Sequence, residues 1–263
     1  MEQQTRQWLT WTIPAVVVIA LAGALYYGRQ HKREPAEAAA KVESTAPTPD
    51  TAASLHHPID PQPGAGAAPL PDLGASDAEV QHSLAQTFGR SLESFLVPKD
   101  IVRHVVATVD NLPRKKIAVQ MWPLRPVSGT LAVEGSDAPT LSDANFARYE
   151  PLMTVLKNTD AKSLSQIYKR FYPLFQQAYV ELGYPDGYFN DRLVAVIDHL
   201  LETPEVPRPI ALKQPGVFYE FADPALEERS AGQKLLIRIG SSNAATAKLK
   251  LRELRREVAK RPE

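Results

Sequence analysis

An uncharged stretch of 21 residues near the amino terminus constrains this chain more than any other feature. No charged residue occurs from Trp8 to Gly28. As a helix the stretch would be about 31 Å long, enough to cross a hydrocarbon core of about 30 Å. Aromatic residues such as Trp8 and Tyr27 lie at its two ends, where interfacial aromatics are found. We therefore expect residues 1–33 to form a transmembrane anchor with a basic flank, which crosses a membrane through residues 8–28.

A cleaved signal peptide is the alternative interpretation of this stretch. Its end is followed by Tyr26-Tyr27-Gly28-Arg29, which makes a poor small-residue cleavage site. Two observations favour opposite orientations of the anchor. Three basic residues follow the stretch and only Arg6 precedes it, which favours a cytoplasmic carboxyl terminus. The long spacer that follows is instead typical of envelope proteins that hold a domain away from the inner membrane. We expect a periplasmic domain, with the cytoplasmic location as the alternative.

Residues 34–75 have the composition of a linker. They hold 8 Pro and 11 Ala among 42 positions and no aromatic residue. Such a segment cannot bury enough apolar surface to offset the entropy of ordering it. The composition predicts a disordered Ala/Pro-rich linker, which as a random coil would span roughly 35 Å.

Residues 76–263 are predicted to form a compact, mainly helical domain with a few short strands. Ser76 and Glu79 have the spacing of a capping box, and Asn190 is predicted to cap a later helix. Apolar residues recur at helical spacing in several segments, and alternation or β-branched residues predict extended structure in others. The expected helices cover 80–96, 101–112, 142–156, 164–182, 190–201, a segment from 223 and a last one ending near 260; the expected strands or extended segments are 117–121, 130–133 and 207–221.

The segment 164–182 has the strongest helical periodicity. Spacing places Tyr168, Phe171, Phe175 and Tyr179 on one apolar face, which favours a place in the core over an aromatic binding platform. Pro173 lies inside the pattern and is expected to kink the helix or to delay its start.

Composition excludes several classes of function. The chain has no Cys, so thiolate zinc sites, iron–sulfur clusters, disulfides and cysteine nucleophiles are excluded. Lys and Arg together number 30, as do Asp and Glu, so bulk charge does not favour nucleic acid. The six His lack metal-ligand spacing, and no phosphate loop or serine nucleophile motif occurs. We expect no cofactor, no metal site and no catalytic residue.

Several short sequence words occur in a fixed order, among them Asn111-Leu-Pro113, Asn145-x-x-Arg148-Tyr149, Leu182-Gly-Tyr-Pro185, Phe189-Asn-Asp-Arg-Leu193 and Ile197-Asp-His-Leu-Leu201. Together they resemble a proteobacterial family, DUF family 3014, of membrane-anchored proteins without assigned activity. The resemblance covers roughly residues 76–258 and departs at Ser241, where the family pattern has Pro. It implies the same layout of anchor, spacer and helical domain, and it implies no activity.

Candidate binding residues come from an aromatic loop and from these words. Tyr184 and Tyr188 flank the turn Pro185-Asp-Gly187, and loop aromatics often bind partners. The full candidate set is Tyr184, Tyr188, Arg148, Tyr149, Asn190 and Arg192.

The last helix is the clearest charge feature. Residues 232–263 hold nine Lys/Arg and three Glu, a net charge of +6, around a narrow apolar row of Leu251, Leu254 and Val258. A solvated face with local ion pairs is the simplest interpretation. The alternative is a basic surface that binds anionic lipid, an acidic partner or the acidic part of its own domain, formed by Lys248, Arg252, Arg255 and Arg256.

These features predict a membrane-tethered, non-catalytic interaction or scaffolding module whose partner is an envelope protein or peptidoglycan. The alternative is a carboxylate-dependent cell-wall hydrolase, for which the candidates are Asp191, Asp198, Glu220 and Asp223. We expect Asp191 to stand at the start of a helix because the helix dipole stabilises its charge there, and Asp198 to pair with Arg148 or Arg170. Nucleic-acid binding through the last helix is a third class, and it is not expected.

Overall fold

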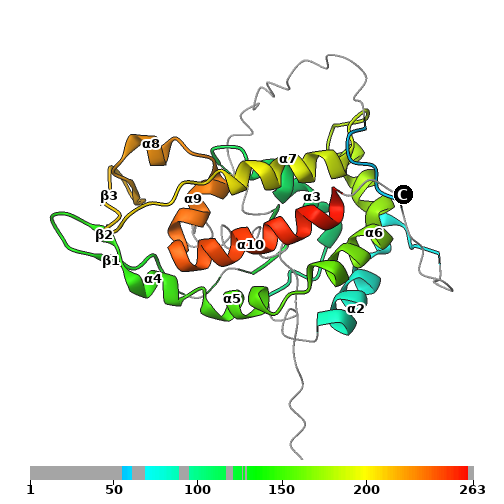
Figure 1. The fold of residues 1–263 in the computed structure, drawn as a ribbon, viewed down its shortest axis with the longest axis horizontal. Coiled ribbons are helices and arrows are strands. Elements are labelled where there is room, and N and C mark those ends of the chain that lie inside the picture. The colour runs from blue at the N-terminus through cyan, green and yellow to red at the C-terminus, as the bar shows by residue number, and fades with distance from the viewer. Residues whose placement is uncertain are drawn as a thin grey trace, which may run out of the picture.

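The computed structural model describes residues 55–60, 69–88, 95–116, 121–125, 127 and 129–259. Within these ranges the fold is mainly helical with a few short strands, as predicted. Figure 1 shows the arrangement. The helices are η1 (Leu73–Ala75), α2 (Asp77–Phe88), α3 (Ile101–Asn111), α4 (Asp143–Ala147), α5 (Glu150–Lys157), α6 (Ala161–Glu181), α7 (Phe189–Leu201), α8 (Pro224–Glu227), α9 (Ala231–Arg238) and α10 (Ser241–Val258); the strands are β1 (Val133–Glu134), β2 (Thr140–Leu141), β3 (Leu212–Lys213) and β4 (Glu220–Phe221).

The basic helix α10 lies in the middle of the fold, packed against α5, α6, α7 and α9 (Figure 1). Its buried residues Ala247, Leu251, Leu254 and Val258 are spaced four, three and four apart, so they form one stripe. The narrow apolar row of the sequence is therefore a core face. α10 begins after Gly240, whose φ of 88° suits glycine. Ser241 is its first residue, a position where a Pro would also fit, because the N–H there has no helical partner.

Helix α6 is continuous through Pro173. It starts at Ala161, where the Asp160 carboxylate accepts from Lys162 N at 3.4 Å and Ser163 N at 2.8 Å. Of the two effects expected of Pro173, a kink or a delayed start, the delayed start is wrong. The helix begins twelve residues before the proline, because the core contacts of its aromatic face offset the one hydrogen bond that Pro removes. The predicted core face is confirmed, since Phe171 is completely buried.

A smaller apolar cluster holds together the end of the fold that contains the strands. β1 pairs with β2 and β3 with β4, each pair antiparallel. Leu141, Ile210, Leu212, Phe221 and Ile237 form its buried centre. The strand predicted at 130–133 lies slightly later, at Val133–Glu134, and only residue 121 of the segment predicted at 117–121 lies within the described residues.

Two predicted helices are divided. The segment 142–156 separates into α4 and α5 because Pro151 requires a new helix start, with Pro in its first turn. The segment after Asp223 separates into α8 and α9, and each has its own cap. The capping box at Ser76 does not form: the Ser76 hydroxyl donates to Leu73 O at 2.8 Å, while Glu79 pairs with Arg170 of α6.

Two segments of the predicted linker contact the domain. Residues 55–60 lie along α7, and residues 69–75 include Leu73, which is 5% exposed. Ile59 and Leu70 pack against the main core. The linker was predicted from the average composition of 42 positions, and that average does not reveal these few apolar residues. The predicted anchor, residues 8–28, lies outside the described residues, and no described helix is long and apolar enough to span a bilayer.

Candidate functional site

The first turn of α7, Phe189–Arg192, directs four consecutive side chains to four different parts of the molecule. Successive residues in a helix are rotated by about 100°. Phe189 enters the core, where its ring stacks on Phe175 with centroids 5.7 Å apart. The next three side chains are polar, and each makes contacts that join distant segments.

Asn190 is completely buried and joins three elements. Its amide nitrogen donates to His57 O at 2.8 Å and to Val258 O at 2.9 Å, and its amide oxygen accepts from the Tyr168 hydroxyl at 3.1 Å. The predicted capping role is wrong, because Tyr188 occupies the N-cap position of α7 and Asn190 follows inside the first turn. A side chain with all these polar atoms paired can be buried without the cost of lost hydration.

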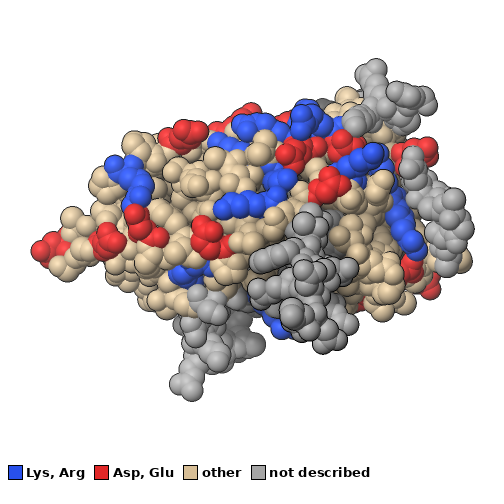
Figure 2. Space-filling model, turned by 60° about the horizontal axis from the view of Figure 1, so that its bottom comes forward, with Lys and Arg blue, Asp and Glu red and all other residues tan. Residues whose placement is uncertain are grey.

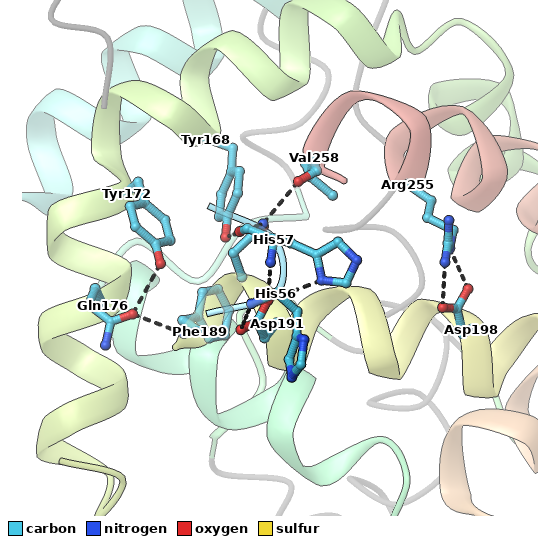
Figure 3. A network of polar contacts seen from close by, with 11 residues as sticks. His56, His57, Tyr168, Tyr172, Gln176, Phe189, Asp191, Asp198, Arg255 and Val258 are labelled. Carbon is cyan, nitrogen blue, oxygen red and sulfur yellow. Dashed lines mark hydrogen bonds and ion pairs between the residues drawn. The ribbon is translucent and has the colours of Figure 1, made fainter. Parts of the chain in front are cut away.

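Asp191 binds the segment 55–60, which we name the N-terminal strap. Its carboxylate accepts from His56 N at 3.0 Å and His57 N at 2.6 Å, and His57 Nδ1 lies 3.0 Å from the same group. Figure 3 shows the strap lying beside the start of α7. Asp191 therefore recognises the backbone of the strap as well as standing at the start of a helix, where the dipole favours its charge.

Arg192 belongs to a polar cluster formed by Asp110, Arg114, Tyr184 and Arg192, which we name the Asp110 cluster. The Asp110 side chain is 1% exposed. It accepts from Arg192 Nε at 3.0 Å, Arg114 Nη2 at 2.7 Å and the Tyr184 hydroxyl at 3.2 Å, while Arg192 Nη2 donates to Asp110 O at 2.8 Å. The cluster joins α3, α7 and the turn between α6 and α7.

Two tyrosines of this region differ from the expected pair of exposed loop aromatics. Tyr184 is half-buried and stacks on Tyr179 with ring centroids 4.5 Å apart. Burial raises the pKa of Tyr179 to about 12 and raises that of Tyr168 as well. Tyr188 is 37% exposed, so of the two predicted loop aromatics it is the one with the larger free surface.

Arg148 and Tyr149 lie apart from the first turn of α7, between α4 and α5. Arg148 donates to Asn145 Oδ1 and to Gly129 O, both at 3.0 Å. Tyr149 is 3% exposed and belongs to the main core, and its burial raises its pKa. The predicted binding set thus divides among several places, of which only Tyr184 and Arg192 share a cluster.

The four candidate acids of the hydrolase alternative each have a different partner. Asp191 binds the strap, and Asp198 pairs with Arg255 of α10 at 2.8 Å, farther along α7 (Figure 3). Glu220 lies 3.8 Å from Lys213 across the β3–β4 pair, and Asp223 caps α8 by accepting from Ala225 N at 2.8 Å. The expectation that Asp198 pairs with an arginine is confirmed, although the partner is neither Arg148 nor Arg170. In the described part of the chain, no three His, Asp or Glu side chains are grouped to hold a metal ion.

The predicted basic surface of α10 is partly used inside the domain. Lys248 donates to Thr203 O, and its burial lowers its pKa. Arg255 binds Asp198, a hydrogen bond that raises the arginine's pKa. Arg252 and Arg256 are exposed. On the face shown in Figure 2, basic and acidic side chains are interspersed. Pairing with the acidic part of its own domain, one of the predicted alternatives, accounts for Arg255.

A family model matches residues 101–255, more than half of the chain; its description is "Protein of unknown function (DUF3014)". The chain belongs to the DUF3014 family. Searches of curated proteins and of solved structures found no significant match. The DUF3014 match includes the Asp110 cluster and the first turn of α7, and the N-terminal strap precedes it. This result confirms membership of the family that the sequence words resembled.

Sequence reasoning missed Asp110 and Arg114. Asp110 follows Val105, Val106 and Val109 in a segment whose other residues are mostly apolar. A single acid on such a segment indicates a buried carboxylate, which requires partners. Its partners lie 4, 74 and 82 positions away in the sequence, so only Arg114, the first of them, could be predicted from helical spacing.

Proposed function

We propose that this DUF3014 chain is a membrane-tethered, non-catalytic interaction module of the bacterial cell envelope. Residues 8–28 serve as the anchor in the inner membrane, and the helical domain is held in the periplasm, where it binds an envelope protein or peptidoglycan. The observation that carries this proposal is the docking of the N-terminal strap on Asn190 and Asp191.

Strap docking supports a tether of defined length. The strap contacts α7 through His56 and His57, so the part of the predicted linker that precedes the strap is residues 34–54. As a random coil these residues span about 25 Å, less than the roughly 35 Å of the whole predicted linker. A domain held this close to a membrane meets partners at or near the membrane surface.

Contacts of the candidate acids favour this function over a hydrolase. A glycosidase needs two carboxylates facing one bond at separations of roughly 5–9.5 Å. Here Asp191 and Asp198 are directed to different partners, and Asp223 is used as a helix cap. Each of these three carboxylates has a structural partner, which argues against a role in proton transfer.

The absence of cysteine allows a direct test of topology. A single cysteine replaces Leu249, which is 51% exposed on α10, and a matched control places it at Gln3. In intact spheroplasts a membrane-impermeant maleimide should label L249C but label Q3C only after the membrane is permeabilised. Labelling of Q3C alone would place the domain in the cytoplasm and contradict the proposal.

A second measurement addresses the absence of catalysis. The purified full-length chain in detergent should release no soluble fragments from isolated cell walls, as measured by chromatography of the supernatant. Release that is lost in Asp198→Asn and kept in the exposed-residue control Arg252→Gln would establish the hydrolase instead.

A further inference from the structure

The Asp110 cluster carries one positive charge more than its buried carboxylate neutralises. Arg114 and Arg192 both bind Asp110, and no other acid in the described ranges forms an ion pair with either arginine. Two guanidinium groups held on one carboxylate repel each other. A second anion beside them would remove this repulsion.

Arg114 presents the unused donors of the cluster. Its Nη2 donates both to Asp110 and to the Tyr184 hydroxyl, so the N–H groups on Nε and Nη1 have no partner within the described residues. The Arg114 side chain is 56% exposed. Because Asp110 is buried and fixed by four contacts, the guanidinium is held in place before any ligand arrives.

Further positive charge follows Arg114 directly in the sequence. Lys115 pairs with Glu228, whereas Lys116 is exposed and forms no ion pair with a described residue. The surface at the end of α3 therefore offers a fixed guanidinium and a tyrosine hydroxyl that is already hydrogen-bonded, and an exposed lysine follows two positions later in the sequence.

We propose that the Asp110 cluster is a binding site for a small oxyanion, a phosphate or carboxylate group, held by the outer N–H groups of Arg114. Charge-assisted hydrogen bonds from guanidinium to such groups are among the strongest in proteins. Holding the arginine rigidly removes part of the entropy cost of binding. Asp110 is then a positioning residue, and Arg114 is the residue that contacts the ligand.

Thermal denaturation of the full-length chain in detergent tests this site. Sodium phosphate, glycerol 1-phosphate and sodium acetate are each titrated against sodium chloride at equal ionic strength. At least one of the three anions should raise the melting temperature saturably by about 2 °C or more, because a ligand of the folded state stabilises it. A rise with glycerol phosphate indicates a lipid headgroup or sugar phosphate as the source, a rise with inorganic phosphate alone the free ion, and a rise with acetate a carboxylate.

Three variants make the test specific. Arg114→Gln should abolish the rise, Arg114→Lys should reduce it, and Arg125→Gln, at an exposed arginine outside every candidate site, should leave it unchanged. Each shift is measured from the variant's own melting temperature in chloride, so a change in stability alone does not imitate a loss of binding. An equal rise in Arg114→Gln, or no saturable rise with any of the anions, would show that the cluster is purely structural. The melting temperature in detergent does not depend on how the chain is oriented in a membrane. The test can therefore support or contradict the anion site whether or not the proposed tethering is right.

Discussion

The two ends of α7 use the same chemistry in different environments. At its first turn, Arg192 binds a carboxylate that is 1% exposed. Toward its other end, Asp198 binds Arg255 with side chains 43% and 39% exposed. Both contacts are carboxylate–guanidinium pairs between helices distant in the sequence. The carboxylate of the first is buried where α3, α7 and the turn after α6 meet, whereas water reaches both side chains of the second.

This difference determines what each pair contributes. Removing one partner of a buried pair leaves an unneutralised charge in a region of low dielectric, which costs several kcal/mol. An exposed pair gains little, since water and salt screen it and two long side chains are immobilised. We therefore expect the first turn of α7 to determine stability and the other end to tolerate change.

Asp110→Ala should have the largest effect. It leaves Arg192, which is 30% exposed, without its carboxylate, and it also removes the acceptor of the Tyr184 hydroxyl. Both arginines stay partly hydrated, so the loss comes from three hydrogen bonds to a charged acceptor and from repulsion between the two guanidinium groups. We expect it to be about 3 kcal/mol in the free energy of unfolding. Urea denaturation followed by circular dichroism measures it. A loss below about 1 kcal/mol would remove the distinction between the two ends.

Asn190→Ala is expected to follow, with a loss of about 2 kcal/mol. The substitution leaves Val258 O and the Tyr168 hydroxyl without their partner in a buried environment. Because the amide also holds His57 O, protease cleavage within the strap should become faster. Urea denaturation and limited proteolysis measure the two effects, and Asn145→Ala, a buried amide on α4, is the control that should leave the strap protected.

Alkaline pH should destabilise the side of the fold that contains the buried tyrosines. Burial raises the pKa of Tyr179 to about 12, above the ordinary value of 10.0. A raised pKa means that the folded state retains the proton, so this contribution is complete below pH 10 and is lost as the pH rises toward 12. At pH 11 the loss from Tyr179 is about 1 kcal/mol. Tyr179→Phe should flatten the fall of the urea midpoint between pH 10 and 12, and an unchanged fall in this variant would contradict the prediction.

Asp191→Ala should reduce stability by about 1 kcal/mol, because the backbone N–H groups of His56 and His57 can turn to water when the strap detaches. The larger effect is on the strap itself. Hydrogen exchange at these two amides should approach the rate of an unstructured peptide. Continued protection in the variant would show that other contacts hold the strap.

Asp198→Ala is expected to change the least, by about 0.5 kcal/mol or less, since its partner Arg255 can remain solvated. The effect should shrink further in high salt. A loss comparable to that of Asp110→Ala would show that exposure does not separate the two pairs.

Much of the helical layout could be predicted from local pattern. The apolar periodicity of α6 and α7 and the cap at Asp223 depend on neighbours within a few positions. Errors occurred where a distant segment competes for a side chain. Asn190 looks like a cap, but the strap and the end of α10 bind its amide, and Glu79 looks like part of a capping box, but it pairs with Arg170.

The sequence itself determined the membership of the family, the helical class and the apolar stripe of α10. Short motifs and apolar periodicity can be recognised from the order of the residues alone. Which charges are buried was decided only by the tertiary structure. Asp110 and Asp198 are the same residue type on amphipathic helices, and the fold covers one and leaves the other in water. Burial depends on the segments that come to lie above a side chain, and those segments lie tens of positions away.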